Sequence, residues 1–329
     1  MIKIVYMGTP EFAVAPLAKL LENKYEITGV ITVPDKAKGR GLQISKSAVK
    51  EFAEQRGIKV LQPLSLKDPD FIKELQELKA DLFIVVAFRM LPKIVWDMPR
   101  MGTFNLHASL LPMYRGAAPI NWAIINGEQK SGVTTFLLDD KIDTGNILLQ
   151  AECNITKEDT FGSLHDKLME IGSNLVLETV KGLENNSLKG ICQDKIIANN
   201  NLSKIPDAPK LTKELCIIDW NKSAQNIEHL IKGLSPHPVA TTKISNNNKC
   251  FDVKIYMADI ENCESADSLK YNFTQDSIRR IVSDNKKYIH VICKNGDILS
   301  IKELQLAGKK RMNVKDFLAG FRDIEDYHF

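Results

Sequence analysis

Apolar and helical stretches alternate over the first half of the chain. Strand-like apolar runs occupy residues 2–7, 27–33, 82–87, 103–106 and 133–138. The stretch 12–21, between the first two runs, has the spacing of a helix. Such alternation is typical of βα units, in which helices cover both faces of a mostly parallel sheet. The pattern therefore predicts an α/β domain whose functional edge lies at the carboxyl ends of the strands.

The pattern changes after residue 160. A long amphipathic helix comes first and closes this domain, with one apolar stripe formed by Leu164, Leu168, Ile171 and Leu175. Residues 184–210 are rich in Asn and Lys and contain Pro206 and Pro209, which favours a linker. We predict a first domain over residues 1–189, a linker over 190–207 and a second domain over 208–329.

Short strands dominate the predicted second domain. A helix with Ser223 as its N-cap precedes them. The strand-like runs occupy residues 239–244, 251–258, 278–282, 288–293 and 298–306. The last two flank Asn295-Gly296, a strong hairpin signal because this pair accepts positive φ. About five short strands predict a small antiparallel barrel of the OB type.

Composition describes a globular protein, with 44% hydrophobic and 26% charged residues. The apolar runs are far shorter than the roughly 20 residues that cross a bilayer. The first eight residues read as a strand entering a turn rather than a targeting signal, so we expect a cytoplasmic location and no membrane partner. Six cysteines without a C-x-x-C pair argue against disulfides and zinc, and we expect no metal.

The net charge of +3 is small and spread over the chain, so binding of a polyanion would depend on local patches. Residues 36–50 form such a patch, with five basic residues and no acidic one. The alternative is a solvated surface loop. The first loop, residues 7–12, has only one glycine where a dinucleotide-binding turn needs several, which argues against a nicotinamide cofactor.

Three polar residues are the candidates for catalysis. Asn105 and His107 are two apart on a predicted strand, so their side chains share one face. Asp143 follows the strand-like run 133–138, which would place it on the same functional edge. An amide, an imidazole and a carboxylate suit acyl transfer, in which an oxyanion develops and a proton moves. The alternative is local hydrogen bonding at a strand end and an ordinary turn.

Several motifs together resemble those of the methionyl-tRNA formyltransferases. They are Met7-Gly8-Thr9-Pro10-Glu11-Phe12, the run from Asn105 to Pro112 with the run from Arg115 to Ile120, and Asp143-Thr144-Gly145. The resemblance continues through residues 208–214, 218–220 and 308–312 and so covers nearly the whole chain. Other formyl-folate enzymes share the first-domain motifs, so the second domain and the basic loop make it specific. The implied fold is a Rossmann-like formyltransferase domain followed by an OB-like barrel.

The resemblance implies transfer of a formyl group from 10-formyltetrahydrofolate to the amino group of methionine on initiator methionyl-tRNA. Folate would be a co-substrate, with no bound cofactor, and the protein a monomer. Our hypothesis is that Asn105 and a His107 N–H hold the formyl oxygen. Asp143 would favour the charged imidazole and help to take the proton from the attacking nitrogen.

The resemblance also implies two sets of binding residues. The first set lines the folate site and consists of Ser109, Leu110, Leu111 and Pro112, with Phe88 and Leu91 in an opposing wall around the pterin. The second set contacts tRNA: Arg40 matches the arginine of the family's inserted loop, with Lys36 and Lys38 beside it. Lys309, Lys310 and Arg311 in the second domain would follow phosphates without reading bases.

Two other functions compete with this one. The chain could be another 10-formyltetrahydrofolate-dependent formyltransferase, acting on an amino-sugar nucleotide or glycinamide ribonucleotide, or a hydrolase of the formyl donor. The predicted barrel and the Arg40 loop disfavour these. A non-catalytic tRNA-binding protein is the second rival, and the presence of Asn105, His107 and Asp143 speaks against it.

Overall fold

The computed structural model describes residues 2–38, 43–200, 204–261, 274 and 277–329. These group into two compact units. The sheet unit comprises Met1–Pro119, Lys130–Asn154 and His165–Ala208, and the barrel unit comprises Ile120–Gln129, Ile155–Leu164 and Pro209–Phe329. Two segments from the sequence of the predicted first domain thus belong to the barrel unit.

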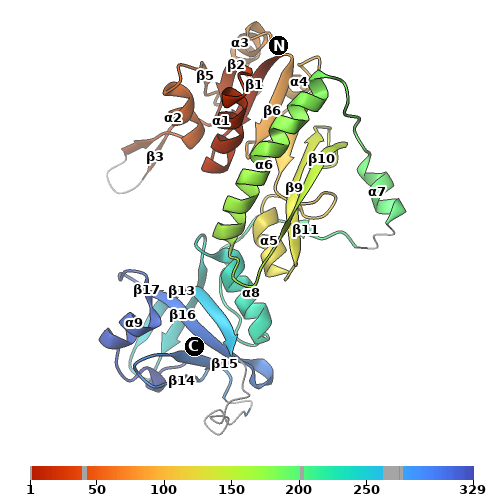
Figure 1. The fold of residues 1–329 in the computed structure, drawn as a ribbon. Helices are drawn as coiled ribbons and strands as arrows, with labels where there is room; N and C mark the ends of the chain where they lie inside the picture. Colours follow the sequence, from red (N-terminus) through yellow and green to blue (C-terminus); the bar gives the residue numbers. More distant parts are fainter. Residues whose placement is uncertain (1, 39–42, 201–203, 262–273, 275–276) are drawn as a thin grey trace. The chain divides into compact units, whose positions relative to one another are not determined.

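The sheet unit is built on a mixed sheet with the order β10-β9-β7-β6-β1-β2-β5 (Figure 1). Its strands are β1 (Lys3–Gly8), β2 (Glu26–Ile31), β5 (Val60–Leu61), β6 (Leu82–Val86), β7 (Thr103–His107), β9 (Lys130–Leu137) and β10 (Ile147–Asn154). The five strands from β5 to β7 are parallel, and β9 and β10 are antiparallel to their neighbours. The prediction of a mostly parallel α/β sheet is confirmed, although β5 and β10 were not predicted.

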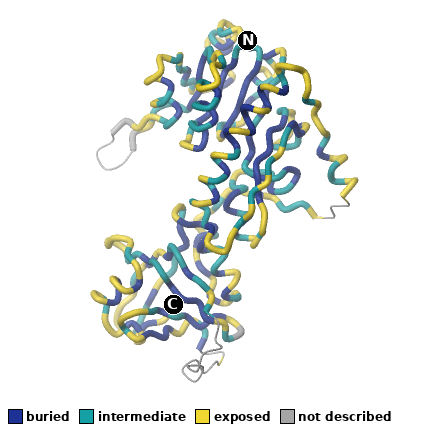
Figure 2. The backbone as a smooth tube through the Cα atoms, in the orientation of Figure 1, coloured by how far each residue is buried: buried dark blue, intermediate teal, exposed yellow. Residues whose placement is uncertain are grey.

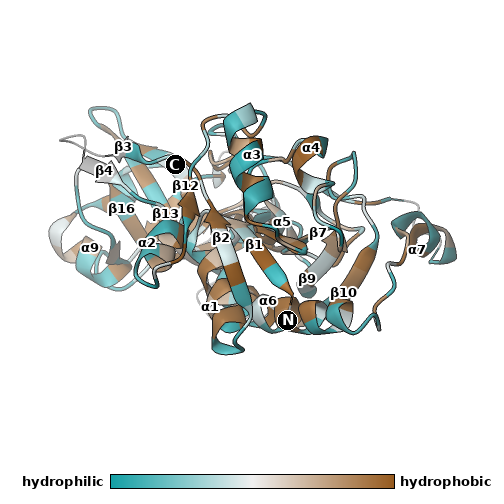
Figure 3. Cartoon of the chain, turned by 90° about the horizontal axis from the view of Figure 1, so that it is seen from above, coloured by the Kyte–Doolittle hydropathy of each residue, from teal (hydrophilic) through white to brown (hydrophobic). Residues whose placement is uncertain are grey.

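Helices cover both faces of this sheet, as Figure 3 shows from above. One face carries α1 (Val14–Glu22) and α6 (Phe161–Glu184), and the other α3 (Pro69–Glu77) and α4 (Lys93–Trp96). A Cβ on Gly172 of α6 would lie 2.9 Å from Leu106 Cδ2, so α6 approaches β7 closely. All five residues of β6 are buried, as expected for a strand covered on both faces (Figure 2).

Residues 190–207, which we predicted as a linker, are folded in part. They contain α7 (Gln193–Asn199) and enter β11 (Asp207–Ala208), which pairs in parallel with β8 (Arg115–Gly116). Ile196 of α7 packs against the buried cluster of Leu111, Phe136 and Ile147. The described part of this segment therefore belongs to the sheet unit rather than forming an extended connection.

The barrel unit is an antiparallel sheet with the order β12-β13-β16-β15-β14, and β17 pairs with β16. Its strands are β12 (Ala240–Ser245), β13 (Cys250–Glu261), β14 (Ile281–Ser283), β15 (Ile289–Ile292), β16 (Ile298–Leu306) and β17 (Met312–Asn313). His328 forms bridges to both Ser245 and Arg280, so it joins the two ends of the sheet. The five predicted strands and the OB-like fold are confirmed.

The described part of the barrel unit also includes α-helices that pack with this sheet. They are α8 (Ala224–Leu234), α9 (Val314–Gly320) and most of α5 (Pro119–Ile125). Ser223 caps α8 by accepting a hydrogen bond from Asn226 N, as predicted. Asn121 in α5 donates to Gly233 O over 2.8 Å, which explains why α5 groups with this unit. No helix in the described part of the chain is both long and apolar enough to span a membrane.

Asp81 forms hydrogen bonds to the first residue of β1 and to the segment that precedes β7. Its carboxylate accepts hydrogen bonds from Lys3 N at 2.8 Å and from Arg100 Nε at 2.7 Å. The bond from Lys3 N, followed by that from Arg100, lowers the pKa of this carboxyl. The stabilisation is present above the unfolded pKa of about 3.9 and is lost as the pH falls through the lower, folded pKa.

We therefore expect Asp81→Asn to lower the free energy of unfolding at pH 7 by about 1 kcal/mol or more, because hydrogen bonds to charged groups are strong. The difference from the wild type should shrink as the solution is acidified below pH ~4. Urea unfolding over a pH series measures this. Glu178→Gln, at an exposed position of α6, is the control, and an equal pH response in both variants would contradict the assignment.

Candidate active site

Asn105 and His107 lie together at the end of β7. Strand alternation gives their side chains one face, opposite to Leu106, which contacts α6. His107 is buried and Asn105 is half-buried. Within the part of the chain that the structure describes, no group hydrogen-bonds to the Asn105 side-chain amide. Its N–H donors are therefore available to a ligand.

His107 is held in one tautomer. Its Nε2 lies 2.8 Å from the carbonyl oxygen of Tyr114. A carbonyl can only accept a hydrogen bond, so Nε2 must carry a proton and donate it. The other ring nitrogen, Nδ1, lies 3.8 Å from Asp143 Oδ2. In the neutral ring Nδ1 is thus a proton acceptor, and it becomes a donor only when the imidazole is charged.

Asp143 comes from the loop between β9 and β10. Its Oδ2 accepts a hydrogen bond from Gly116 N at 2.9 Å, and its side chain is 15% exposed. This residue has φ 53°, in the left-handed region that non-glycine residues seldom adopt. The carboxylate is therefore fixed on one side by a backbone donor and faces the imidazole on the other.

The reason that we gave for the position of Asp143 is wrong. We placed it at the carboxyl edge of the sheet because it follows a strand. However, β9 is antiparallel to β7, and Leu137 at its end pairs with Phe104 near the beginning of β7. Asp143 reaches His107 because its loop turns back: Leu137 N bonds to Asn146 O, and a Cβ on Gly145 would lie 1.7 Å from Leu137 O.

Sequence reasoning missed Gln193 in α7. Its side chain is buried, and its Nε2 donates to the carbonyl oxygens of Asp143 at 2.9 Å and Gly145 at 2.8 Å. Its Oε1 accepts from Arg115 Nη2 at 2.6 Å and Nε at 3.1 Å. A single glutamine in a short helix of a polar segment carries no sequence signal that distinguishes it from a surface residue.

The predicted folate segment, Ser109 to Pro112, follows β7 directly and is tied to β9 and β10. Thr134 of β9 donates to Ser109 O at 2.6 Å and accepts from Leu111 N at 3.1 Å. Gln150 of β10 donates to Leu111 O at 2.8 Å. Ser109, Leu111 and Pro112 are buried, while Leu110 is half-buried. The segment is thus rigid, with several of its backbone groups already bonded inside the protein.

The predicted pterin wall follows β6. Leu91 is buried in the core cluster of the α3 face, and the half-buried Phe88 packs against that cluster. Arg89 between them donates from Nη2 to Pro63 O at 2.9 Å and from Nη1 to Leu64 O at 3.2 Å. Burial lowers the pKa of the Arg89 guanidinium. Arg89 therefore ties the loop after β6 to the loop after β5.

The basic loop begins and ends in a two-stranded ribbon of β3 (Lys36–Lys38) and β4 (Gln43–Ser45). Lys36 is exposed. Arg40 lies outside the described residues, as does the side chain of Lys38. For these two residues the predicted contact with tRNA stays a prediction.

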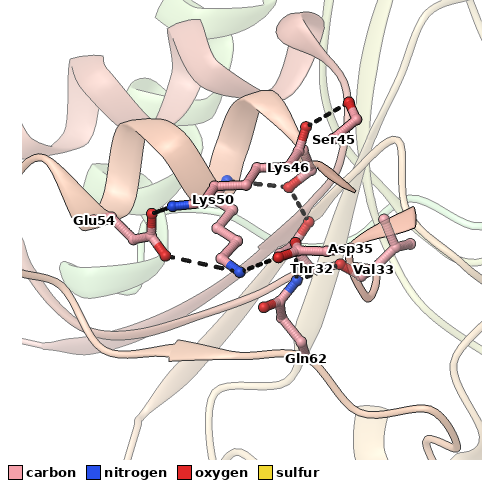
Figure 4. Close-up of polar contacts among 9 residues, drawn as sticks. Thr32, Val33, Asp35, Ser45, Lys46, Lys50, Glu54 and Gln62 are labelled. Atoms are coloured by element: carbon pink, nitrogen blue, oxygen red, sulfur yellow. Dashed lines mark hydrogen bonds and ion pairs between the residues drawn. The ribbon is translucent and has the colours of Figure 1, made fainter. Parts of the chain in front are cut away.

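A polar network holds the base of this ribbon (Figure 4). Asp35 accepts hydrogen bonds from Lys50 Nζ at 2.6 Å and Gln62 Nε2 at 2.8 Å. These two bonds lower the pKa of Asp35. The hydroxyls of Thr32 and Ser47 lie 2.7 Å apart. The ribbon therefore leaves the sheet unit from a fixed base.

The basic residues predicted in the second domain follow β16. Lys309, Lys310 and Arg311 are all exposed. Arg311 forms an ion pair with Glu303, and its guanidinium lies 4.3 Å from the ring centroid of Tyr256. Its charge is therefore partly neutralised, whereas the two lysines present theirs to solvent. Among the described residues no group of three His, Cys, Asp or Glu is arranged to hold a metal ion.

Comparison with known proteins assigns both parts of the chain to formyl transferases. The formyl transferase family matches residues 2–180, and the formyl transferase C-terminal domain matches residues 210–322. A solved structure of WlaRD, a sugar 3N-formyl transferase, has a TM-score of 0.64 and 23% identity over 94% of this chain and 99% of that one. HypX from Aquifex aeolicus, solved with tetrahydrofolic acid, has a TM-score of 0.62 and 17% identity, covering 96% of this chain and 47% of that one.

Curated relatives are more similar in sequence. The methionyl-tRNA formyltransferase of Parabacteroides distasonis is 50% identical over 328 residues, which is 99% of this chain and 98% of the relative. That of Flavobacterium johnsoniae is 50% identical over 319 residues, 97% of this chain and 96% of the relative. The family resemblance of the sequence motifs is confirmed: this chain belongs to the methionyl-tRNA formyltransferase family.

Proposed function

We propose that this protein transfers the formyl group of 10-formyltetrahydrofolate to the amino group of methionine on initiator methionyl-tRNA. The reaction places formylmethionine at the start of translation. The observation that carries the proposal is the pairing of His107 Nδ1 with Asp143 beside the available amide of Asn105. This pairing occurs in a chain that is half identical, over nearly its full length, to enzymes named for that reaction.

The geometry around His107 supports a defined proton path. The amine of methionine attacks the formyl carbon, so negative charge develops on the formyl oxygen and the nitrogen becomes acidic. Neutral His107 accepts that proton at Nδ1, because Nε2–H is held by the Tyr114 carbonyl. The charged ring is stabilised by Asp143 and passes the proton to the folate nitrogen as the old C–N bond breaks.

Asn105 would hold the developing oxyanion through its side-chain N–H. Pairing of β7 with β6 and β9 fixes the backbone of Asn105, so only the side-chain torsions have to adjust as charge develops. After it has taken the proton from the amine, the charged His107 ring would also donate from Nδ1 to this oxygen, before it passes that proton to the folate nitrogen. This refines our hypothesis, in which either ring N–H of His107 was allowed: the contact of Nε2 with Tyr114 leaves only Nδ1 for that role.

The folate would lie against the segment from Ser109 to Pro112, which begins two residues after His107. Phe88 and Leu91 supply the apolar wall for the pterin. For tRNA, the ribbon that carries Arg40 is the first contact, and the exposed Lys309 and Lys310 offer phosphate contacts in the barrel unit. We further propose that the protein acts as a cytoplasmic monomer.

The rival functions have less support. A formyltransferase for sugar nucleotides shares the fold, as the WlaRD comparison indicates, but at 23% identity. The relatives at 50% identity carry the methionyl-tRNA name. A non-catalytic tRNA-binding protein would have no use for the pairing of His107 with Asp143.

The direct test is to mix the purified protein with 10-formyltetrahydrofolate and methionine-charged initiator tRNA and to assay formylmethionine. We expect rapid formylation of the initiator and little with elongator methionyl-tRNA. Formylation of a dTDP-amino sugar instead, or release of formate without an acceptor, would favour a rival function.

Substitution of the catalytic residues should slow the reaction without unfolding the protein. We expect Asn105→Ala to lower kcat by about 10² to 10³, the usual cost of losing one oxyanion donor. His107→Ala should cost about 10² to 10⁴, because it also removes the proton carrier. Single-turnover formylation measures both effects. Asn174→Ala, at an exposed position of α6, is the control, and near wild-type rates in the two folded variants would refute the assignment.

Substitution of Arg40 should weaken the binding of tRNA and not that of folate. We expect Arg40→Ala to raise KM for charged tRNA while folate binding stays unchanged, because in the sequence the residue falls between β3 and β4, far from the predicted folate residues 88–91 and 109–112. The dependence of tRNA affinity on salt should also become shallower, since about one fewer counterion is released for each phosphate that the protein no longer neutralises.

Lys73→Ala removes one positive charge from an exposed position of α3 and serves as the control for net charge. Equal effects of the two variants on tRNA affinity would mean that Arg40 makes no specific contact. A loss of folate binding in Arg40→Ala would point to misfolding of the sheet unit.

A further inference from the structure

We infer that the connection between the two matched domains, residues 181–209, helps to hold the active site in its catalytic geometry. Within this connection, Gln193 is the residue that positions Asp143. The inference rests on the proposed function, because it concerns the same reaction. The two formyl transferase families match residues 2–180 and 210–322, so neither covers this connection. Within it, Gln193 of α7 nevertheless bonds to the loop that carries Asp143.

Both the nitrogen and the oxygen of the Gln193 side-chain amide form hydrogen bonds. The two N–H bonds of its Nε2 reach the carbonyls of Asp143 and Gly145, on either side of Thr144. Its oxygen accepts both bonds from Arg115, so the amide cannot rotate without losing bonds at both ends. The side chain is 1% exposed, and a buried amide gains no replacement bonds from water. The backbone of the Asp143 loop is therefore fixed from the α7 side.

The second half of the connection holds the partner groups of the catalytic pair. Pro206 O accepts from Tyr114 N at 2.6 Å, and Ala208 O accepts from Ala117 N at 2.7 Å. Tyr114 presents its carbonyl to His107, and Gly116, beside Ala117, donates to Asp143. One connection thus fixes the acceptor for His107 Nε2, the donor for Asp143 Oδ2 and the backbone of Asp143.

Backbone strain shows why this support matters. Asp143 and Tyr114 have φ values of 53° and 59°, both in the left-handed region. Non-glycine residues keep such conformations only where surrounding contacts impose them. Gln193 bonds to the carbonyl of the first, and Pro206 bonds to the N–H of the second. Gly116 has φ 124°, and a Cβ there would lie 2.5 Å from Ala208 O, so β8 and β11 fit closely.

The expected consequence is a specific effect on turnover. If Gln193 no longer donates, the loop can relax from its strained form and carry the carboxylate away from His107. Substrate binding depends on other segments and should change little. Gln193 is therefore a positioning residue, which acts through Asp143 and touches neither substrate.

Gln193→Glu keeps the hydrogen bonds on the Arg115 side of the contact and removes those on the Asp143 side. The carboxylate still accepts from Arg115, but it offers no donor to the carbonyls of Asp143 and Gly145. We expect kcat to fall about 10- to 100-fold, by analogy with the cost of losing an outer-shell residue that orients a metal ligand, with both KM values within about twofold of the wild type. Asn199→Asp introduces the same charge at an exposed position of α7 and should leave kcat unchanged.

A double-mutant cycle with Asp143→Asn tests whether Gln193 acts through Asp143. In the Asp143→Asn background, Gln193→Glu should cost less than about threefold, because residues that act through one another are not additive. If kcat of the double variant instead falls by the product of the two single-variant losses, the inference is overturned. So would unchanged kcat in Gln193→Glu. Gln193→Met, which removes both ends of the contact at similar volume, gives the same comparison if the glutamate variant unfolds, and unfolding of both would show a purely structural role.

The wild-type assay separates this inference from the proposed function. If the wild type formylates no methionyl-tRNA, the proposed function fails, whatever the variants do. If it does formylate and Gln193→Glu behaves like Asn199→Asp, only the inference about the connection fails.

Discussion

The hydrogen bond from His107 Nε2 to the Tyr114 carbonyl is the constraint on which the chemistry of this site depends. It decides which ring nitrogen carries a proton and which faces Asp143. Without it, the neutral imidazole could adopt either tautomer, and part of its population would present an N–H where a base is needed. The bond in turn needs Tyr114 in a left-handed conformation, which the chain keeps by bonding Tyr114 N to Pro206 O.

Four segments, from β7 to the connection after α6, therefore build this site together. Strand β7 supplies Asn105 and His107 on a rigid ladder between β6 and β9. The loop after β9 brings Asp143 back to them, and the turn at 114–116 contributes a carbonyl and an N–H. The connection after α6 secures that turn and that loop. Apart from β7, these segments are loops or elements of seven residues or fewer, so hydrogen bonds contribute much of the catalytic geometry.

The parts of this site that follow a regular period were predictable from sequence. Alternation along β7 gave the common face of Asn105 and His107, and the apolar runs gave most of the sheet. The motif Asp143-Thr144-Gly145 identifies Asp143, whereas the direction of β9 is not visible in the sequence, because a single strand shows no sign of being parallel or antiparallel. Gln193 was not predictable, since its role depends on burial against a loop 50 residues earlier. The polar residues of 190–207, which favour a linker by composition, include Gln193, whose side chain bonds to the Asp143 loop.

A connection that belongs to the active site changes how the domains of this chain should be divided. A cut before residue 190 would keep every motif of the formyltransferase domain but remove Gln193, Pro206 and the strand β11. The same cut would leave Leu111 of the predicted folate segment, and Phe136 in the same buried cluster, without the cover of Ile196. The smallest unit that preserves the His107 and Asp143 geometry thus extends to Ala208. The sequence between the two domains is then constrained by catalysis, even though its composition is that of a loop.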